Sequence, residues 1–145
     1  MLDLAIQLLD PELPVPTYAH AGDAGLDLYA RIDGVVTPGG GRLLVPTGIA
    51  IALPAGHAGF VLPRSGLALK FGVTVANAPG LIDAGYRDEV KVILLNTHPA
   101  EPYIMRRGDR VAQLVVQRVE SVSLRIVVGL GDSDRGTGGF GSSGR

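Results

Sequence analysis

The sequence contains no cysteine, and this absence excludes disulfides, thiolate zinc sites and cysteine nucleophiles together. It also has no excess of charge of one sign, because 13 lysines and arginines stand against 14 aspartates and glutamates, for a formal net charge of -1. A chain without a basic field does not bind nucleic acid or an anionic membrane over a broad surface. Any binding of phosphate therefore has to be local.

Long apolar runs are absent as well. The chain nowhere approaches the roughly 18 uninterrupted apolar residues of a membrane span, and its start, MLDLAIQLLDPELP, lacks the basic region of a signal peptide. We therefore expect a cytoplasmic protein that binds neither membrane nor nucleic acid. Its 145 residues suit one domain, yet 46% hydrophobic and only 19% charged residues leave much apolar surface to bury. Burial between subunits would account for that surplus.

Patterns typical of long helices are scarce, since 21 glycines and 10 prolines are spread through the chain. Apolar residues instead alternate with a period of two, which is the pattern of strands. We expect strands at residues 2–9, 48–53, 58–62, 72–76, 89–96, 110–117 and 123–128, with one short helix at 65–70. Many short strands with little helix predict an all-β fold, an antiparallel jelly-roll-like sandwich or barrel.

The strand pattern stops near residue 129, and the remainder is rich in glycine and serine. We therefore divide the chain into a β domain at residues 1–128 and a flexible C-terminal arm at 129–145. The arm contains GTGGFG, which formally fits a dinucleotide-binding fingerprint, but only four residues remain to form the helix that this fingerprint must open. The three histidines lie far apart without metal-ligand spacing, so we expect no zinc site.

Two stretches carry polar groups that could bind a ligand. PRSGLALK places Arg64, Ser65 and Gly66 directly after an apolar strand, where a guanidinium, a hydroxyl and backbone N–H groups could together hold a phosphate oxygen. An ordinary turn that opens a short helix is the alternative. NAPGLIDAGYRDEVKVILLN reads as two strands joined by a loop with Asp83 and Tyr86 at its centre, which is either turn chemistry alone or a binding site.

Two further stretches are open to either interpretation. Gln113 lies in the otherwise apolar strand of RRGDRVAQLVV, as an edge or interface residue or as a ligand contact. Asp23 and Asp27 lie around glycines in GDAGLDLYA, which taken alone is a turn that enters a strand.

From about residue 21 to its end, the chain closely resembles the trimeric deoxyuridine triphosphatases. Five segments match the motifs of that family in residue type, order and approximate spacing: AGDAGLDL, PRSGLALK, NAPGLIDAGYRDEVKV, RGDRVAQL and RGTGGFGSSG. The resemblance implies a jelly-roll-like β fold, a homotrimer with shared active sites, and hydrolysis of dUTP to dUMP and pyrophosphate. Water would attack the α-phosphorus with Mg²⁺ bound to the triphosphate. The reaction would supply dUMP for thymidylate synthesis and keep uracil out of DNA.

The same resemblance implies roles for the polar residues. Asp83 would be the catalytic residue, which orients and deprotonates the attacking water. Arg64, Ser65 and Gln113 would hold phosphate oxygens, and Gly66 would let the backbone approach them closely. Much of the catalysis would then be alignment and neutralisation of charge.

The resemblance also implies which residues act on the metal and on the nucleoside. Asp27 would help to place Mg²⁺ through its water shell or brace the catalytic centre. The residues implied for uracil are Asn77, Leu81, Ile82 and Lys91. Cytosine would leave buried groups unpaired there, at roughly 1–3 kcal/mol per group. Tyr86 would pack on the deoxyribose and exclude a 2′-hydroxyl.

The arm would complete the site. Arg135 would pair with terminal phosphate oxygens and Phe140 would stack on the uracil ring, with stacking worth about 1–3 kcal/mol. Such an arm would exclude water from the bound nucleotide. A disordered solubilising tail, removable without loss of activity, is the alternative.

One position departs from the family pattern. Asp88 stands where glycine is usual, and we expect a small strain there if the position needs a left-handed backbone. Two rival functions stay open: a dCTP deaminase-like enzyme on the same fold, and a non-catalytic nucleotide-binding or regulatory protein. The Asp83 and Tyr86 hairpin and the Arg and Phe arm favour the triphosphatase.

Overall fold

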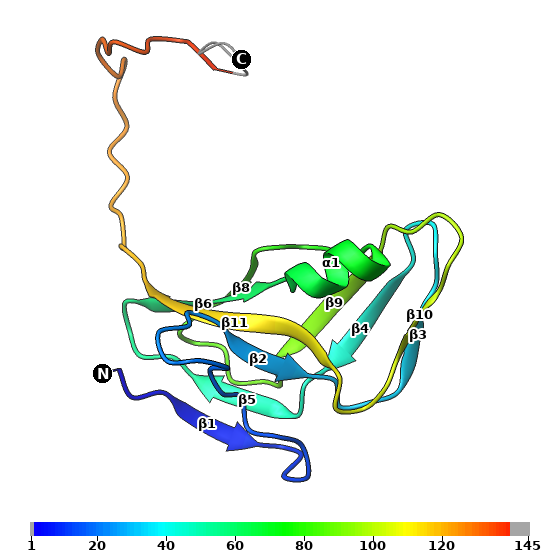
Figure 1. Ribbon diagram of the computed structural model, residues 1–145. Coiled ribbons are helices and arrows are strands. Elements are labelled where there is room, and N and C mark those ends of the chain that lie inside the picture. Colours follow the sequence, from blue (N-terminus) through cyan, green and yellow to red (C-terminus); the bar gives the residue numbers. More distant parts are fainter. Residues whose placement is uncertain (1, 140–145) are drawn as a thin grey trace.

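The computed structural model describes residues 2–139. Within them the chain forms eleven strands and one short helix (Figure 1). The elements are β1 (Ala5–Leu8), β2 (Leu26–Tyr29), β3 (Gly34–Val36), β4 (Arg42–Pro46), β5 (Ile49–Ala52), β6 (His57–Leu62), α1 (Ser65–Phe71), β7 (Val73–Val75), β8 (Gly80–Ile82), β9 (Lys91–Asn96), β10 (Tyr103–Met105) and β11 (Arg110–Arg118).

The described strands form four antiparallel sheets. The largest has the order β2-β11-β6-β8, and a second has the order β4-β9-β7. Two smaller pairs, β1 with β5 and β3 with β10, complete the arrangement. In the largest sheet β2 and β8 occupy the two opposite edges. Three strand spacings separate these edges, which amounts to about 14 Å.

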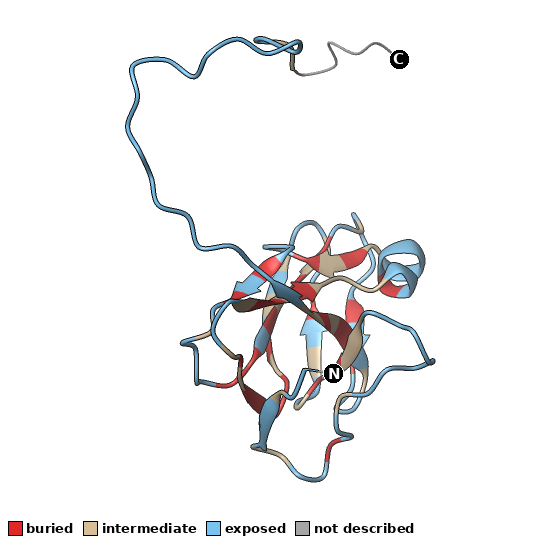
Figure 2. Ribbon diagram, turned by 90° about the vertical axis from the view of Figure 1, so that its left-hand side faces the viewer, coloured by how far each residue is buried: buried red, intermediate tan, exposed pale blue. Residues whose placement is uncertain are grey.

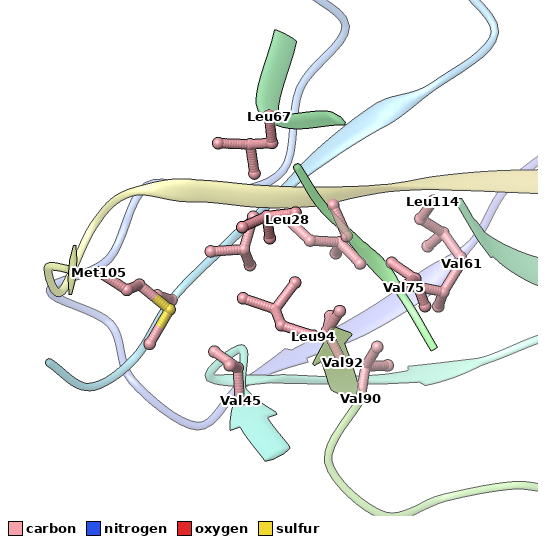
Figure 3. Close-up of a cluster of buried hydrophobic side chains, with 14 of the residues drawn as sticks. Leu28, Val45, Val61, Leu67, Val75, Val90, Val92, Leu94, Met105 and Leu114 are labelled. Carbon is pink, nitrogen blue, oxygen red and sulfur yellow. The ribbon is translucent and has the colours of Figure 1, made fainter. Parts of the chain in front are cut away.

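The core lies between the two larger sheets. Leu28 and Leu114 from the four-stranded sheet meet Val92 and Leu94 from the three-stranded sheet (Figure 3). These side chains are fully buried, and burying each contributes about 1.5–3 kcal/mol. Alternate residues of β9 point inward, so buried and more exposed positions follow one another along this strand, and other ribbons likewise carry both buried and exposed positions (Figure 2).

The helix α1 follows β6 after a two-residue connection and packs on the core through Leu67. It ends at Gly72, which has a φ of 66° and donates its N–H to Ala68 O and Leu67 O. The left-handed backbone conformation at this position favours glycine, and the N–H group satisfies carbonyl groups at the end of the helix. The short helix expected at residues 65–70 is confirmed.

The expected strand at residues 123–128 is wrong. The structure places these residues outside any sheet, on a segment that leads away from the body (Figure 1). The Val119 N–H still donates to Gly56 O at 2.9 Å. Beyond it the apolar alternation has no neighbouring strand among residues 2–139, and Leu124 and Ile126 are 89% and 99% exposed. A periodic pattern forms a strand only where a partner supplies the hydrogen bonds.

Candidate active site

A cavity of about 480 Å³ lies where β2, the β6–α1 connection and β11 meet. We call it the phosphate cavity. Five residues expected to bind phosphate or metal line it: Asp27, Arg64, Ser65, Gly66 and Gln113. The register of β11 explains the convergence, because Gln113 pairs with Asp27 on β2 and with Leu62 on β6. Three segments that are distant in sequence are thereby brought to one place.

Asp27 forms ion pairs with two arginines in the wall of the phosphate cavity. Its Oδ1 accepts from Arg64 Nε at 3.1 Å, and its Oδ2 accepts from Arg110 Nη1 at 3.2 Å. Arg64 Nη1 also donates to the Arg110 carbonyl at 3.2 Å. The carboxylate is largely buried, whereas the two guanidinium groups are more exposed. The pair of cations is therefore held at the cavity by one shared anion.

The first turn of α1 offers further donors. The Arg64 carbonyl accepts from the N–H groups of Leu67 and Ala68, both at 3.1 Å. The N–H groups of the first helical residues, Ser65 and Gly66, are those that a helix leaves without internal partners. Both residues are exposed and line the cavity. A hydroxyl and two N–H groups thus stand beside the arginines.

Gln113 is held rigidly in the same wall. Its Nε2 donates to the Pro63 carbonyl at 2.9 Å. Gly25 lies against the other end of the amide, where a Cβ atom would overlap Gln113 Oε1 and force the amide to shift. The side chain is therefore fixed from both sides.

A second cavity, of about 230 Å³, lies on the hairpin of residues 77–91, which we call the substrate hairpin. Five residues expected to contact the nucleotide line it: Leu81, Ile82, Asp83, Tyr86 and Lys91. The Tyr86 N–H donates to Asp83 O at 3.0 Å and closes the turn between them. We call this the hairpin cavity.

The two cavities have no lining residue in common within the described chain. Asp27 lies on β2, whereas Leu81 and Ile82 lie on β8, at the opposite edge of the same sheet. One copy of the chain therefore carries the phosphate cavity and the hairpin cavity at opposite edges of the largest sheet.

The comparisons with known proteins agree with this arrangement of motifs. A model of the dUTPase family matches residues 11–144. The chain belongs to the dUTPase family. A deoxyuridine 5′-triphosphate nucleotidohydrolase of Thermobifida fusca (strain YX) is 61% identical over 139 residues, which cover 96% of this chain and 77% of the relative.

Solved dUTPase structures share the fold. The dUTPase of Staphylococcus bacteriophage 80alpha with dUPNHPP is 27% identical and has a TM-score of 0.91, with 100% of both chains covered. A mutant dUTPase from phage phi11 of S. aureus, described with a structural Mg(II) ion, is 24% identical, with a TM-score of 0.80 over 88% of this chain and 98% of that chain. The likeness confirms the expected all-β, jelly-roll-like fold.

Three residues expected in the dUTPase site lie elsewhere or outside the described chain. Asn77 lies in the turn between β7 and β8, beside Gly80, and is not among the residues that line the hairpin cavity. Arg135 lies in the segment that follows β11, where its Nε donates to Gly138 O at 2.8 Å. Phe140 lies outside the described residues.

Asp88 is engaged within the hairpin itself. Its Oδ1 accepts the Glu89 N–H at 2.7 Å, and its Oδ2 lies 3.6 Å from Lys91 Nζ. The Glu89 N–H, followed by the charge of Lys91, lowers the pKa of the Asp88 carboxyl. The aspartate therefore caps the turn and holds Lys91 at the edge of the cavity.

The residues that sequence reasoning missed in this dUTPase are Arg110, Gly25 and Glu89. On a regular strand Arg110 and Gln113 would point to opposite faces, but the register of β11 against β2 shifts between Arg110 and Ala112. This irregularity lets both side chains line the phosphate cavity. The sequence shows an arginine directly before the apolar residues of this strand, but it does not show on which face of the strand that side chain lies.

Two general features complete the description. Among residues 2–139, no group of three or more histidine, aspartate or glutamate side chains lies together in a way that could hold a metal ion. No helix in the described part of the chain is long and apolar enough to cross a membrane.

Proposed function

We propose that the protein hydrolyses dUTP to dUMP and pyrophosphate by attack of water at the α-phosphorus. Membership of the dUTPase family supports this activity. The observation that carries it is the phosphate cavity, in which two arginines, a hydroxyl and the N–H groups of a helix start converge on one volume. Such donors neutralise the charge of a triphosphate and align it for attack.

We assign the proton transfer to Asp83. Its carboxylate is exposed on the substrate hairpin and lines the hairpin cavity with Tyr86. A carboxylate at this position can accept the proton of a water molecule within hydrogen-bond reach. The phosphate-binding roles go to Arg64, Ser65 and Gln113, with Gly66 allowing close approach of the backbone.

Recognition of the nucleoside is assigned to the hairpin cavity. We propose that backbone groups of Leu81 and Ile82 meet the uracil edge, with Asn77 and Lys91 beside them. Tyr86 would pack on the deoxyribose, because its ring lines this cavity next to Asp83. The volume of about 230 Å³ suits a base and sugar and leaves the triphosphate outside it.

Magnesium fits this chemistry as an ion held mainly by the substrate. The described residues offer no cluster of acidic ligands, and both oxygens of Asp27 accept from arginines. A carboxylate oxygen keeps a further lone pair, so Asp27 can reach the water shell of the ion. When bound, Mg²⁺ would neutralise charge on the phosphate oxygens.

We infer that the active enzyme is a homotrimer in which neighbouring copies complete each site. The two cavities lie at opposite edges of one sheet, and this supports a site formed by the hairpin of one copy and the phosphate cavity of another. Residues 122–130 supply a surface for assembly, because apolar side chains alternate there and are exposed. A strand-like segment of this kind gains its hydrogen bonds from another chain.

We further propose that residues 129–145 form an arm that closes over the bound nucleotide, with Arg135 on the terminal phosphates and Phe140 on the base. The β domain would comprise residues 1–128. The location we propose is the cytoplasm, where free deoxynucleotides are made and used.

The test is release of pyrophosphate, with Mg²⁺ present, from dUTP, dCTP, dTTP and UTP in parallel. We expect turnover of dUTP alone, and loss of that turnover in a chain that ends at Asp134. Formation of ammonia from dCTP would assign a deaminase instead. Full activity of the shortened chain would contradict the role of the arm.

A further inference from the structure

Glu89 is a buried carboxylate at the base of the substrate hairpin, and the proposed reaction makes no use of it. Its side chain is 11% exposed. Oε1 accepts the Gly48 backbone N–H at 2.8 Å and lies 3.3 Å from Arg31 Nη1. A carboxylate with a backbone donor and a guanidinium is held in one position.

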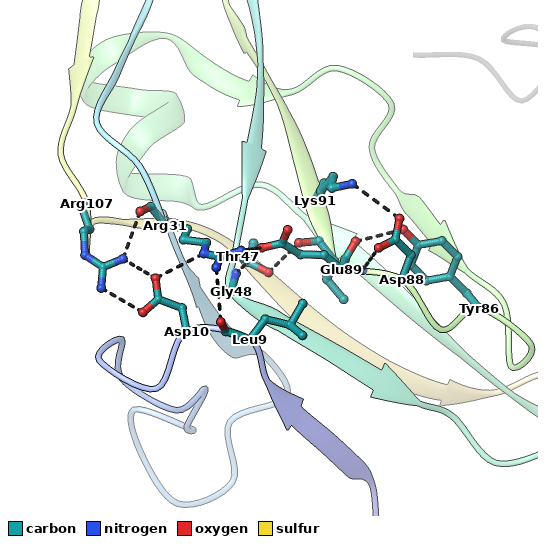
Figure 4. A network of polar contacts seen from close by, with 11 residues as sticks. Leu9, Asp10, Arg31, Thr47, Gly48, Tyr86, Asp88, Glu89, Lys91 and Arg107 are labelled. Atoms are coloured by element: carbon teal, nitrogen blue, oxygen red, sulfur yellow. Dashed lines mark hydrogen bonds and ion pairs between the residues drawn. The ribbon is translucent and has the colours of Figure 1, made fainter.

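The backbone carbonyl of the same residue contacts a side chain of the substrate hairpin. It accepts the Tyr86 hydroxyl at 2.9 Å (Figure 4). The next residue, Val90, is fixed as well, because its N–H donates to Ile49 O at 2.8 Å and its carbonyl accepts Thr47 Oγ1 at 2.6 Å. Glu89 therefore joins a rigid turn between β4 and β5 to the ring that lines the hairpin cavity.

The partner of Glu89 is itself anchored away from the hairpin. Arg31 Nε donates to Asp10 Oδ2 at 3.3 Å, and Arg31 Nη2 donates to Leu9 O at 3.2 Å. Arg107 Nη2 donates to the other oxygen of Asp10 at 3.0 Å. The chain of contacts in Figure 4 thus runs from Arg107 to Tyr86 and requires no nucleotide.

We propose that Glu89 is a positioning residue for sugar selection: its buried carboxylate fixes the carbonyl that holds the Tyr86 hydroxyl, and so fixes the ring against the 2′ position. This inference rests on the proposed function. Without the carboxylate, the peptide between residues 89 and 90 keeps the Val90 N–H bond to Ile49 O but loses its anchor to Gly48 and Arg31, so its carbonyl shifts relative to the phenol. The ring then moves, and a 2′-hydroxyl gains room.

The first experiment measures kcat and KM for dUTP and for UTP in the wild type, Glu89→Ala and Glu89→Gln. We expect Glu89→Ala to lower the preference for dUTP over UTP roughly tenfold, mainly through a higher kcat/KM for UTP. Glu89→Gln should recover most of that preference, because its Oε1 can still accept the Gly48 N–H. Asp10→Asn is the matched control, since it weakens the same network at its far end and should lower Tm without changing the preference.

A second measurement separates positioning from general support of the fold. Tyr86→Phe removes the hydroxyl that Glu89 holds. If Glu89 acts through Tyr86, adding Glu89→Ala to Tyr86→Phe changes the preference less than the sum of the two single changes. If Glu89→Ala does not fold, Glu89→Asp replaces it, because its shorter side chain keeps the charge but retracts from Gly48.

An unchanged preference in folded Glu89→Ala (or in Glu89→Asp where it replaces that variant), or full additivity with Tyr86→Phe, would overturn the proposal. If the wild type hydrolyses no dUTP, the proposed function fails. The preference is then measured as the ratio of the dissociation constants of dUTP and UTP in the same variants. The two failures are therefore distinguishable.

Discussion

Gly25 packs so closely against Gln113 that a Cβ atom at residue 25 would overlap the Gln113 Oε1 atom and lie 3.2 Å from its Cδ. The other end of the amide is bonded to the Pro63 carbonyl. The amide therefore has no free direction in which to move except into the phosphate cavity.

Gly25→Ala should lower kcat/KM for dUTP by roughly 10–100-fold, because a displaced amide disturbs the alignment of the triphosphate. Steady-state kinetics measure the loss. Ala55→Ser is the control, since Ala55 is exposed and lines neither cavity. Equal activity of the two variants would show that the contact between residues 25 and 113 does not matter for catalysis.

Asp83→Asn should lower kcat by about 10²–10⁴-fold, because an amide cannot accept the proton of the attacking water. The side chain is exposed, so the fold and the affinity for the nucleotide should hold. Calorimetric titration with a non-hydrolysable dUTP analogue measures that affinity. A variant with nearly full turnover would remove Asp83 from the catalytic role.

The stability of the protein should depend on pH through the carboxyl group of Asp10. The hydrogen bond from Arg107 lowers the pKa of Asp10 from its ordinary value of 3.8 to about 2. A carboxyl whose pKa is depressed by folding stabilises the fold above its unfolded pKa and loses that contribution as the pH falls through the folded pKa. Urea unfolding of the wild type should therefore show stability declining between pH 4 and pH 2, and Asp10→Asn should flatten this decline. An identical slope in both proteins would contradict the assignment.

Ile126→Asp should disrupt the trimer and lower activity together. The side chain is 99% exposed in the single chain, so a charge there leaves the β domain intact but is costly inside an interface. Light scattering after size-exclusion chromatography measures the mass. Ser123→Asp, which adds the same charge at an exposed polar position of the segment, should keep the trimer. Trimers of normal mass from both variants would locate the interface elsewhere.

The sequence predicted the parts of this structure that depend on local chemistry. Alternation predicted β5, β6, β7, β9 and β11, and the run after Arg64 predicted α1. The resemblance to the deoxyuridine triphosphatases assigned Arg64, Ser65 and Gln113 to one phosphate site, and all three line one cavity in the structure. These features depend on residue type and spacing, which the sequence contains directly.

What escaped prediction depends on long-range geometry. Glu89 reads as an ordinary charge at the start of a strand, and its burial depends on Arg31, which lies 58 residues away. The direction of Arg110 depends on an irregularity in the ladder between β11 and β2. The segment at 123–128 has the right alternation but no partner strand among residues 2–139. In each of these cases the local structure depends on a residue that is distant in sequence or on another chain.

The placement of β2 and β8 at opposite edges of one sheet also has a genetic consequence. A chain with an inactive hairpin and a chain with an inactive phosphate cavity would each be dead alone. Mixed at equal amounts, they should regain about a quarter of the normal sites, namely those where an intact hairpin of one meets an intact cavity of the other. Two null alleles could then complement each other in the same cell.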